Sequence, residues 1–130
     1  MSKRLHVVSK HQEYGSAEGF NWKYEEFHAL LDDLNCAVEC GDDCSDEFEC
    51  GAEYFKEAID LLKDYKDCKE NNRLDEFKAR LKSNEELDIT IEELEKDLKG
   101  LGGIDYVLPL MERFYEERDK ESWWISFVAW

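Results

Sequence analysis

Five cysteines give this chain its widest range of possible chemistry. They are Cys36, Cys40, Cys44, Cys50 and Cys68. A structural zinc site usually takes pairs of thiolates, two to four residues apart, on tight turns. The first three cysteines are each four residues apart, and no Cys-x-x-Cys pair occurs. The spacing therefore argues against a metal site, and we expect none.

Residues 36–50 give these cysteines a simpler role. The two flanks alternate with a period of two around a turn-like middle, which is typical of a β-hairpin. One face would carry Cys36, Val38 and Cys40 on the first strand and Phe48 and Cys50 on the second. Free cysteine packs as a small apolar residue, so this face is predicted to lie in the core. Cys44, in the turn, and Cys68 are expected to be exposed.

Catalysis by cysteine or histidine has little support in the sequence. The three histidines, His6, His11 and His28, belong to no paired-histidine or nucleophile-elbow motif. The glycines after position 99 resemble a helix stop, since no Gly-Lys-Ser/Thr follows them as in a phosphate loop. We predict no catalytic residues, no cofactor and no enzymatic activity. A small metal- or thiol-dependent enzyme is kept as an alternative function.

Calcium is the other cation that the carboxylates could attract. Asp42, Asp43, Asp46 and Glu47 stand together in the predicted turn. An EF-hand loop alternates its oxygen ligands, has a central glycine and ends on a glutamate at its twelfth position. This turn has none of that spacing, so no dedicated site is predicted.

Charge is the most informative property of the sequence. The net charge of the chain is −16, which repels nucleic-acid phosphates and anionic lipid. The nearest approach to a basic patch is Lys3, Arg4 and Lys10, so we expect neither direct nucleic-acid binding nor membrane binding. Residues 24–55 contain no lysine or arginine. Their acidic residues are Glu25, Glu26, Asp32, Asp33, Glu39, Asp42, Asp43, Asp46, Glu47, Glu49 and Glu53.

Two explanations of this acidic window are open. It could serve solubility alone, or it could be a docking surface that steers a basic protein partner into place. We favour the second explanation because it accounts for the missing cations, and we take the eleven acidic residues as the partner-binding site. Size and charge would suit an inhibitor that mimics nucleic acid, an antidote to a basic toxin, or a small anti-defence protein of a phage or plasmid.

The last strand offers an alternative function. Residues 122–130 are apolar at nearly every position, whereas a strand on a one-sided sheet should have one polar face. Trp124, Val128 and Trp130 would point away from the core. Either the helices of residues 68–119 cover them, or a second copy of the chain does. The second case predicts a structural or accessory protein that forms a homodimer.

The elements follow from hydrophobic periodicity. Residues 5–8 predict a strand, 22–35 a helix, 36–50 a hairpin and 55–65 a second helix. Thr90 and Glu93 form a capping box that starts a further helix among those of residues 68–119. This order predicts a single α+β domain over residues 1–130. Its fold would be a ferredoxin-like split β-α-β antiparallel sheet, with 68–119 as a helical insertion before the last strand. The alternative is a three-stranded sheet with an all-helical C-terminal half.

The cellular location is an expectation from absences. No stretch approaches the roughly 18 apolar residues of a membrane helix. The apolar run after the N-terminal Lys and Arg is too short for the core of a signal peptide. Cysteines in such a chain are expected to stay reduced, so we predict a cytoplasmic protein.

Overall fold

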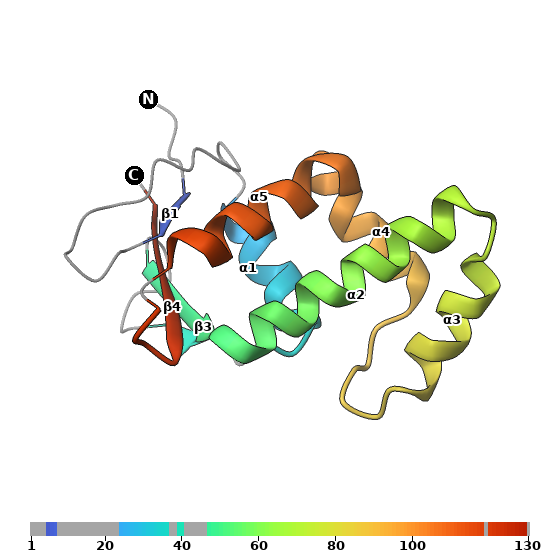
Figure 1. Cartoon of the computed structure of the whole chain (residues 1–130), viewed down its shortest axis with the longest axis horizontal. Helices are drawn as coiled ribbons and strands as arrows, with labels where there is room; N and C mark the ends of the chain where they lie inside the picture. Colours follow the sequence, from blue (N-terminus) through green and yellow to red (C-terminus); the bar gives the residue numbers. More distant parts are fainter. Residues whose placement is uncertain (1–4, 8–23, 37–38, 41–46, 119, 130) are drawn as a thin grey trace.

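The computed structural model describes residues 5–7, 24–36, 39–40, 47–118 and 120–129. Four short strands lie at one end of the molecule, and α3 lies at the other (Figure 1). The strands are β1 (Leu5–Val7), β2 (Glu39–Cys40), β3 (Glu47–Gly51) and β4 (Trp124–Ala129). The helices are α1 (Tyr24–Asp33), α2 (Ala52–Glu70), α3 (Leu74–Ser83), α4 (Ile91–Gly100) and α5 (Ile104–Glu117).

Helix α2 runs from the sheet to the far end of the molecule (Figure 1). Its apolar residues recur every three or four positions, so one stripe along its length is buried. Phe55, Ile59 and Leu62 lie on that stripe and are at most 2% exposed. The first half of the stripe packs toward the sheet and the second half against α3. There the rings of Tyr65 and Phe77 meet edge to face, with 5.4 Å between their centroids.

Helix α4 begins and ends where its sequence predicts. The Thr90 hydroxyl oxygen accepts a hydrogen bond of 3.1 Å from the backbone N–H of Glu93, which satisfies a donor that the helix leaves open. At the other end Gly102 and Gly103 adopt φ values of 109° and 97°. Only glycine adopts these values without strain, and they let the Gly103 N–H bond back to the Leu98 carbonyl at 2.7 Å. Helix α5 then starts at once.

The sheet is antiparallel throughout, with the strand order β1-β4-β3-β2. Its main part is the β3–β4 pair, which runs from Glu47 opposite Val128 to Gly51 opposite Trp124. Strand β1 adds three residues on one side and β2 two on the other. The predicted hairpin of residues 36–50 is confirmed for Glu39–Cys40 and Glu47–Cys50 only. Cys36 lies outside the strand, and residues 37–38 and the turn at 41–46 lie outside the described residues.

The ferredoxin-like prediction is wrong. A split β-α-β sheet has its first strand at the centre, whereas here β1 is at the edge and β4 lies between β1 and β3. Helices hold most of the described residues, and the sheet is small. The physical reason is that the last strand is the most apolar one, so burying it beside two neighbours gains the most. The helices of 68–119 are likewise no insertion, because they supply much of the core.

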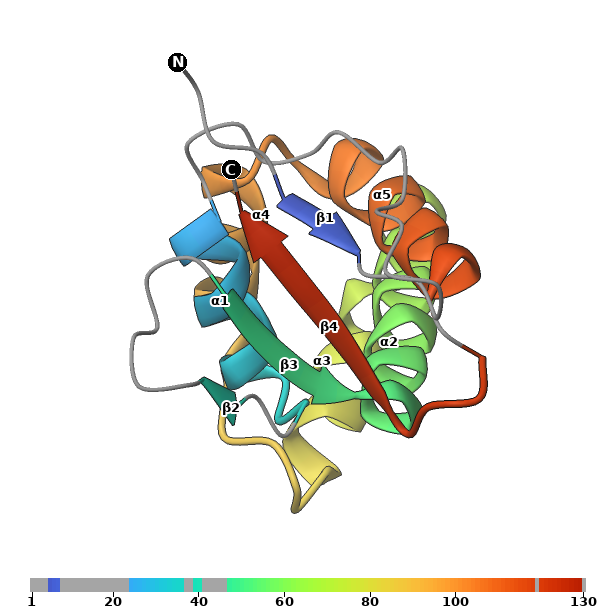
Figure 2. The ribbon, with the colours of Figure 1, turned by 90° about the vertical axis from the view of Figure 1, so that its left-hand side faces the viewer.

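The core lies between the sheet and the helices. Figure 2 shows the sheet in front, with α1, α2 and α5 behind it. Phe127 of β4 is the centre of this contact, and its ring centroid lies 5.5 to 5.9 Å from those of three other rings. These rings belong to Phe27 of α1, Phe55 of α2 and Phe114 of α5. The aromatic cluster therefore joins the sheet to three helices, and all of these helices are on the same side of it.

Candidate docking surface

The face of the sheet that points away from the helices is the first part of the candidate site. Successive strand residues point to opposite faces. Cys50, Ile125 and Phe127 are buried against the helices, so the alternate positions belong to the other face. There Glu49 is exposed, and Trp124 keeps 37% of its surface exposed. Among the described residues no helix covers this face (Figure 2).

Acidic residues meet across the strands of this sheet. Glu49 of β3 is paired with Glu39 of β2, and Glu47 occupies the β3 position opposite Val128. Like charges directly opposite each other on neighbouring strands destabilise a sheet. The backbone register therefore places two acidic residues at opposite positions of β2 and β3.

Exposed aromatic rings lie at the corner where β3 turns into α2. Trp123 is 77% exposed, and its carbonyl accepts a hydrogen bond of 2.9 Å from the Ala52 N–H. Tyr54, in the first turn of α2, is 46% exposed and packs over Gly51. A Cβ atom at Gly51 would lie 2.7 Å from the Tyr54 ring, so a larger residue there would displace it. Tryptophan and tyrosine exposed in this way are common anchors of protein interfaces.

The structure describes five of the predicted partner-binding side chains. Glu26, Asp32 and Asp33 lie on α1, Glu49 lies on β3 and Glu53 in the first turn of α2, and all five are exposed. Of the other acidic residues in the window, only the backbone is described for Glu25, Glu39 and Glu47. Asp42, Asp43 and Asp46 lie outside the described residues.

None of these five carboxylates forms an ion pair with a lysine or arginine of the described residues. Elsewhere such pairs are frequent. They are Lys56–Asp60, Lys66–Asp105, Arg73–Asp67, Arg73–Glu76, Arg80–Asp64 and Lys120–Glu116. Outside the window some described carboxylates, such as Glu57 and Glu86, also lack an ion pair, so the window differs from the rest mainly in containing no lysine or arginine.

Asp33 does not face the same way as the sheet residues. Its carboxyl group lies beside that of Asp97 on α4, where Asp97 Oδ2 is buried and no donor among the described residues reaches it. Partial burial, followed by the hydrogen bond and charge of Asp33, raises the pKa of Asp97 to about 7. Asp97 therefore keeps its proton up to about pH 7. No pattern in the sequence indicates this contact, because residues 33 and 97 belong to separate helices.

The cysteine predictions divide into two groups. Cys36 and Cys50 are buried as expected, and burial raises the pKa of the Cys36 thiol to about 12 and that of Cys50 further. Thiols with such a raised pKa are poor nucleophiles at neutral pH. The side chain of Cys40 and all of Cys44 lie outside the described set.

The predicted exposure of Cys68 is wrong, because its side chain is fully buried. It follows Tyr65 by three positions on the buried stripe of α2, which is the signal that could have placed it inside. Its sulfur atom lies 3.1 Å from the Arg80 guanidinium, and Arg80 in turn holds Asp64 through two hydrogen bonds of 2.8 and 2.9 Å. The three side chains thus fasten α3 to α2.

The residues predicted as an oligomer surface are only partly described. Trp124 is 37% exposed, whereas Val128 is placed by its backbone alone, between His6 and Glu47. Trp130 lies outside the described residues. Helix α5, which was one candidate to cover this side of the strand, packs on the opposite face together with α1 and α2 (Figure 2).

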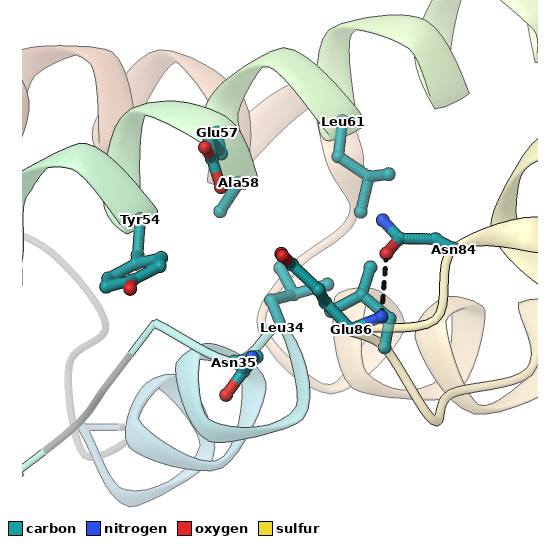
Figure 3. Close-up of a pocket in the computed structure, with 9 residues that line it drawn as sticks. Leu34, Asn35, Tyr54, Glu57, Ala58, Leu61, Asn84 and Glu86 are labelled. Atoms are coloured by element: carbon teal, nitrogen blue, oxygen red, sulfur yellow. Dashed lines mark hydrogen bonds between the residues drawn. The ribbon is translucent and has the colours of Figure 1, made fainter.

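A small pocket, which sequence reasoning did not predict, opens beside the Tyr54 ring. It lies between the end of α1, the first half of α2 and the loop from α3 to α4 (Figure 3). Its volume is about 50 Å³, enough for the end of one side chain. Because its walls come from three separated segments, no local pattern in the sequence indicates it.

Comparison of this chain with known proteins does not assign it to a family. No known family model, curated protein or solved structure matches this chain.

Within the described ranges, no group of three or more histidine, cysteine, aspartate or glutamate side chains is arranged to hold a metal ion. None of the described helices has both the length and the apolar surface needed to cross a membrane.

Proposed function

We propose that this protein binds a basic protein partner, without catalysis, through a docking surface formed by Glu49, Glu53, Trp123 and Trp124. One observation carries the proposal. Residues 24–55 contain no lysine or arginine, and their five described carboxylates are exposed with no ion pair to a cation of the described residues. A basic partner would supply the missing cations.

The composition of the surface suits such a partner. Exposed carboxylates attract a basic protein over about a Debye length and so raise the rate of encounter. The exposed rings then provide apolar area to exclude water, which lengthens the life of the complex. Glu39 and Glu47, in register beside Glu49 and Val128, extend the same acidic stretch of the sheet. An inhibitor, an antidote to a basic toxin and a mimic of nucleic acid are all proteins of this kind.

Charge reversal tests this proposal. A partner is first recovered from the source cell on the wild-type protein at low salt, and its affinity is then measured by titration. Reversing two docking charges, E49K/E53K, should weaken binding by about tenfold or more, since each reversal replaces attraction by repulsion. The matched control E70K/E112K reverses two exposed charges that lie outside the docking surface. A partner that binds E49K/E53K as tightly as wild type, or whose affinity is insensitive to salt, would contradict the proposal.

A second candidate function is self-association through the aromatic end of β4. The observation in its favour is the exposure of Trp123 and Trp124, which are 77% and 37% exposed in a single chain. Large exposed aromatic area is usually covered by another molecule. Light scattering across a concentration series distinguishes the candidates. A dimer that dissociates in the W123S/W124S variant supports self-association, and a monomer at all concentrations excludes it.

A further inference from the structure

The pocket beside Tyr54 has walls of three kinds. Aliphatic side chains of α1 and α2 line it from opposite sides, two carboxylates and two amides lie around it, and the Tyr54 ring lies at one side (Figure 3). The residues are Leu34, Asn35, Tyr54, Glu57, Ala58, Leu61, Asn84, Glu86 and Leu87. No lysine or arginine lines it. The pocket therefore has both acidic and apolar walls.

Two glutamates give the pocket its charge. Figure 3 shows the Glu86 carboxylate extending from the α3–α4 loop into the space beneath α2, with Glu57 on α2 above it. Both side chains are exposed, and neither forms an ion pair with a cation of the described chain. Two negative charges across a small pocket repel each other unless a cation lies between them.

The backbone holds the rim in place. The Asn84 side-chain oxygen accepts a 3.0 Å hydrogen bond from the Glu86 N–H, which fixes the turn that presents Glu86. On the other side, Asn35 has a φ of 56°, in the left-handed region that asparagine tolerates, and its N–H bonds to the Asp32 carbonyl at 3.0 Å. A rim set by local turns needs little rearrangement to bind a ligand.

An arginine side chain fits these walls better than other cations do. Its three-carbon stem would lie on the aliphatic side chains, and its planar guanidinium would reach the carboxylates and stack on an aromatic face. The molecule already uses both contacts elsewhere. Arg80 holds Asp64 with two hydrogen bonds, and the Arg118 guanidinium lies 3.6 Å from the centre of the Tyr115 ring. Lysine has a compact, strongly hydrated charge that is harder to desolvate.

We propose that the pocket between α1, α2 and the α3–α4 loop binds an arginine side chain of the partner, held by Glu57 and Glu86 and covered by Tyr54. This inference rests on the proposed function, because it assigns the pocket to the same basic partner. The two sites are adjacent in the structure. Tyr54 packs over Gly51, which pairs with Trp124 of the docking surface.

The experiment uses three short peptides that differ at one residue. Acetyl-Gly-Arg-Gly-amide is titrated into the ¹⁵N-labelled full-length protein, beside the same peptide with lysine and with citrulline, which keeps the shape of arginine without its charge. We expect the arginine peptide to shift the backbone amide signals of Asn35, Leu61 and Glu86. The E57Q/E86Q variant should bind it roughly tenfold more weakly, because it loses two charge-assisted hydrogen bonds. The matched control E70Q/E112Q should bind it as wild type does.

Three results would overturn the pocket assignment. They are no shift of the pocket amides, equal binding of the arginine and citrulline peptides, and equal binding of the arginine and lysine peptides. Because both glutamates are exposed, E57Q/E86Q is expected to fold, and a thermal melt verifies this. The single variant Y54L supplies a second readout, since loss of the ring should weaken arginine binding while both glutamates are intact.

The partner itself separates this inference from the proposed function. If E49K/E53K weakens binding of the partner and E57Q/E86Q does not, the pocket assignment fails and the docking surface stands. If the arginine peptide binds the pocket while E49K/E53K leaves the partner unaffected, the docking surface fails and the pocket stands.

Discussion

The sheet end and the helical end of this molecule use their charges in opposite ways. At the helical end, Arg80 bridges α3 to Asp64 of α2, and Arg73 reaches both Asp67 and Glu76. At the sheet end Glu49 stands opposite another glutamate, and no lysine or arginine occurs between residues 24 and 55. The charges of one end hold helices together. The described carboxylates of the acidic window form no ion pair with a cation of the described residues, and a binding role would explain why they are there.

The largest effect should come from the cluster that joins the two ends. Truncating Phe127 removes a ring that packs on α1, α2 and α5 together, and F127A should lower the free energy of unfolding by about 3–5 kcal/mol. Chemical denaturation followed by far-ultraviolet circular dichroism and by tryptophan fluorescence measures it. Because the ring joins both ends, the two probes should report one shared transition. Separate midpoints would mean that the ends unfold independently.

The contact of Asp33 with Asp97 joins α1 to α4, and its effect should depend on pH. Asp97 has a folded-state pKa of about 7 against an ordinary value of 3.8, so its contribution is fully present below pH 3.8 and is lost as pH rises to about 7. Asparagine carries no charge at any pH, so the D97N variant does not lose stability when pH rises through this range. It should be more stable than wild type by about 1 kcal/mol above pH 7, a value limited by solvent screening of a partly exposed group, and no more stable near pH 4.

Denaturant melts of D97N at several pH values measure this gain. Glu93 and Lys96 are the other charged groups that act on Asp97. Glu92 is exposed on the same helix and is not among them, so E92Q serves as the control for charge loss on α4. A stability gain of D97N that is the same at pH 4 and pH 8 would contradict the carboxyl pair.

Removing the main cation of the helical end should destabilise the protein. Arg80 donates two hydrogen bonds to Asp64 and one to the Cys68 sulfur, so R80M should lower the melting temperature. The loss should shrink as salt is added, because salt screens the ion pair that only wild type has. A melt series from low to high ionic strength measures it, and an unchanged melting temperature at low salt would contradict the structural role.

Removing a charge at the sheet end should instead stabilise the protein, and this effect should be the smallest of the four. Replacing Glu49 by glutamine removes the like-charge pair with Glu39, so E49Q should raise the free energy of unfolding by about 0.5 kcal/mol. The gain should vanish at high salt. If E49Q is destabilising, the glutamate has a structural partner, and the contrast between the two ends is wrong.

Local features of the fold could be predicted from the sequence. The hairpin strands and the start of α4 at Thr90 follow from patterns within a few residues, and the structure confirms them. The strand order could not be predicted, because it depends on which strands gain most from central burial, and that is a property of the whole chain. Trp124 shows the same limit, since its exposure depends on α5 packing on the other face.

The candidate site was predictable only as a charge pattern. The absence of lysine and arginine over residues 24–55 is visible in the sequence, but the exposure and pairing of each carboxylate is not. The pocket was hidden because its glutamates, Glu57 and Glu86, are far apart in the chain and neither belongs to a motif. Asp33 was predicted as a carboxylate of the docking surface, but its carboxyl group lies beside that of Asp97 on α4.

Hydrogen exchange of the complex tests the central claim most directly. Amide exchange is measured by mass spectrometry for the protein alone and with its partner bound. Binding should slow exchange in β3, the first turn of α2 and residues 123–126, and should leave exchange in α3 unchanged. Protection confined to α3 and α4, with none at the sheet, would contradict it.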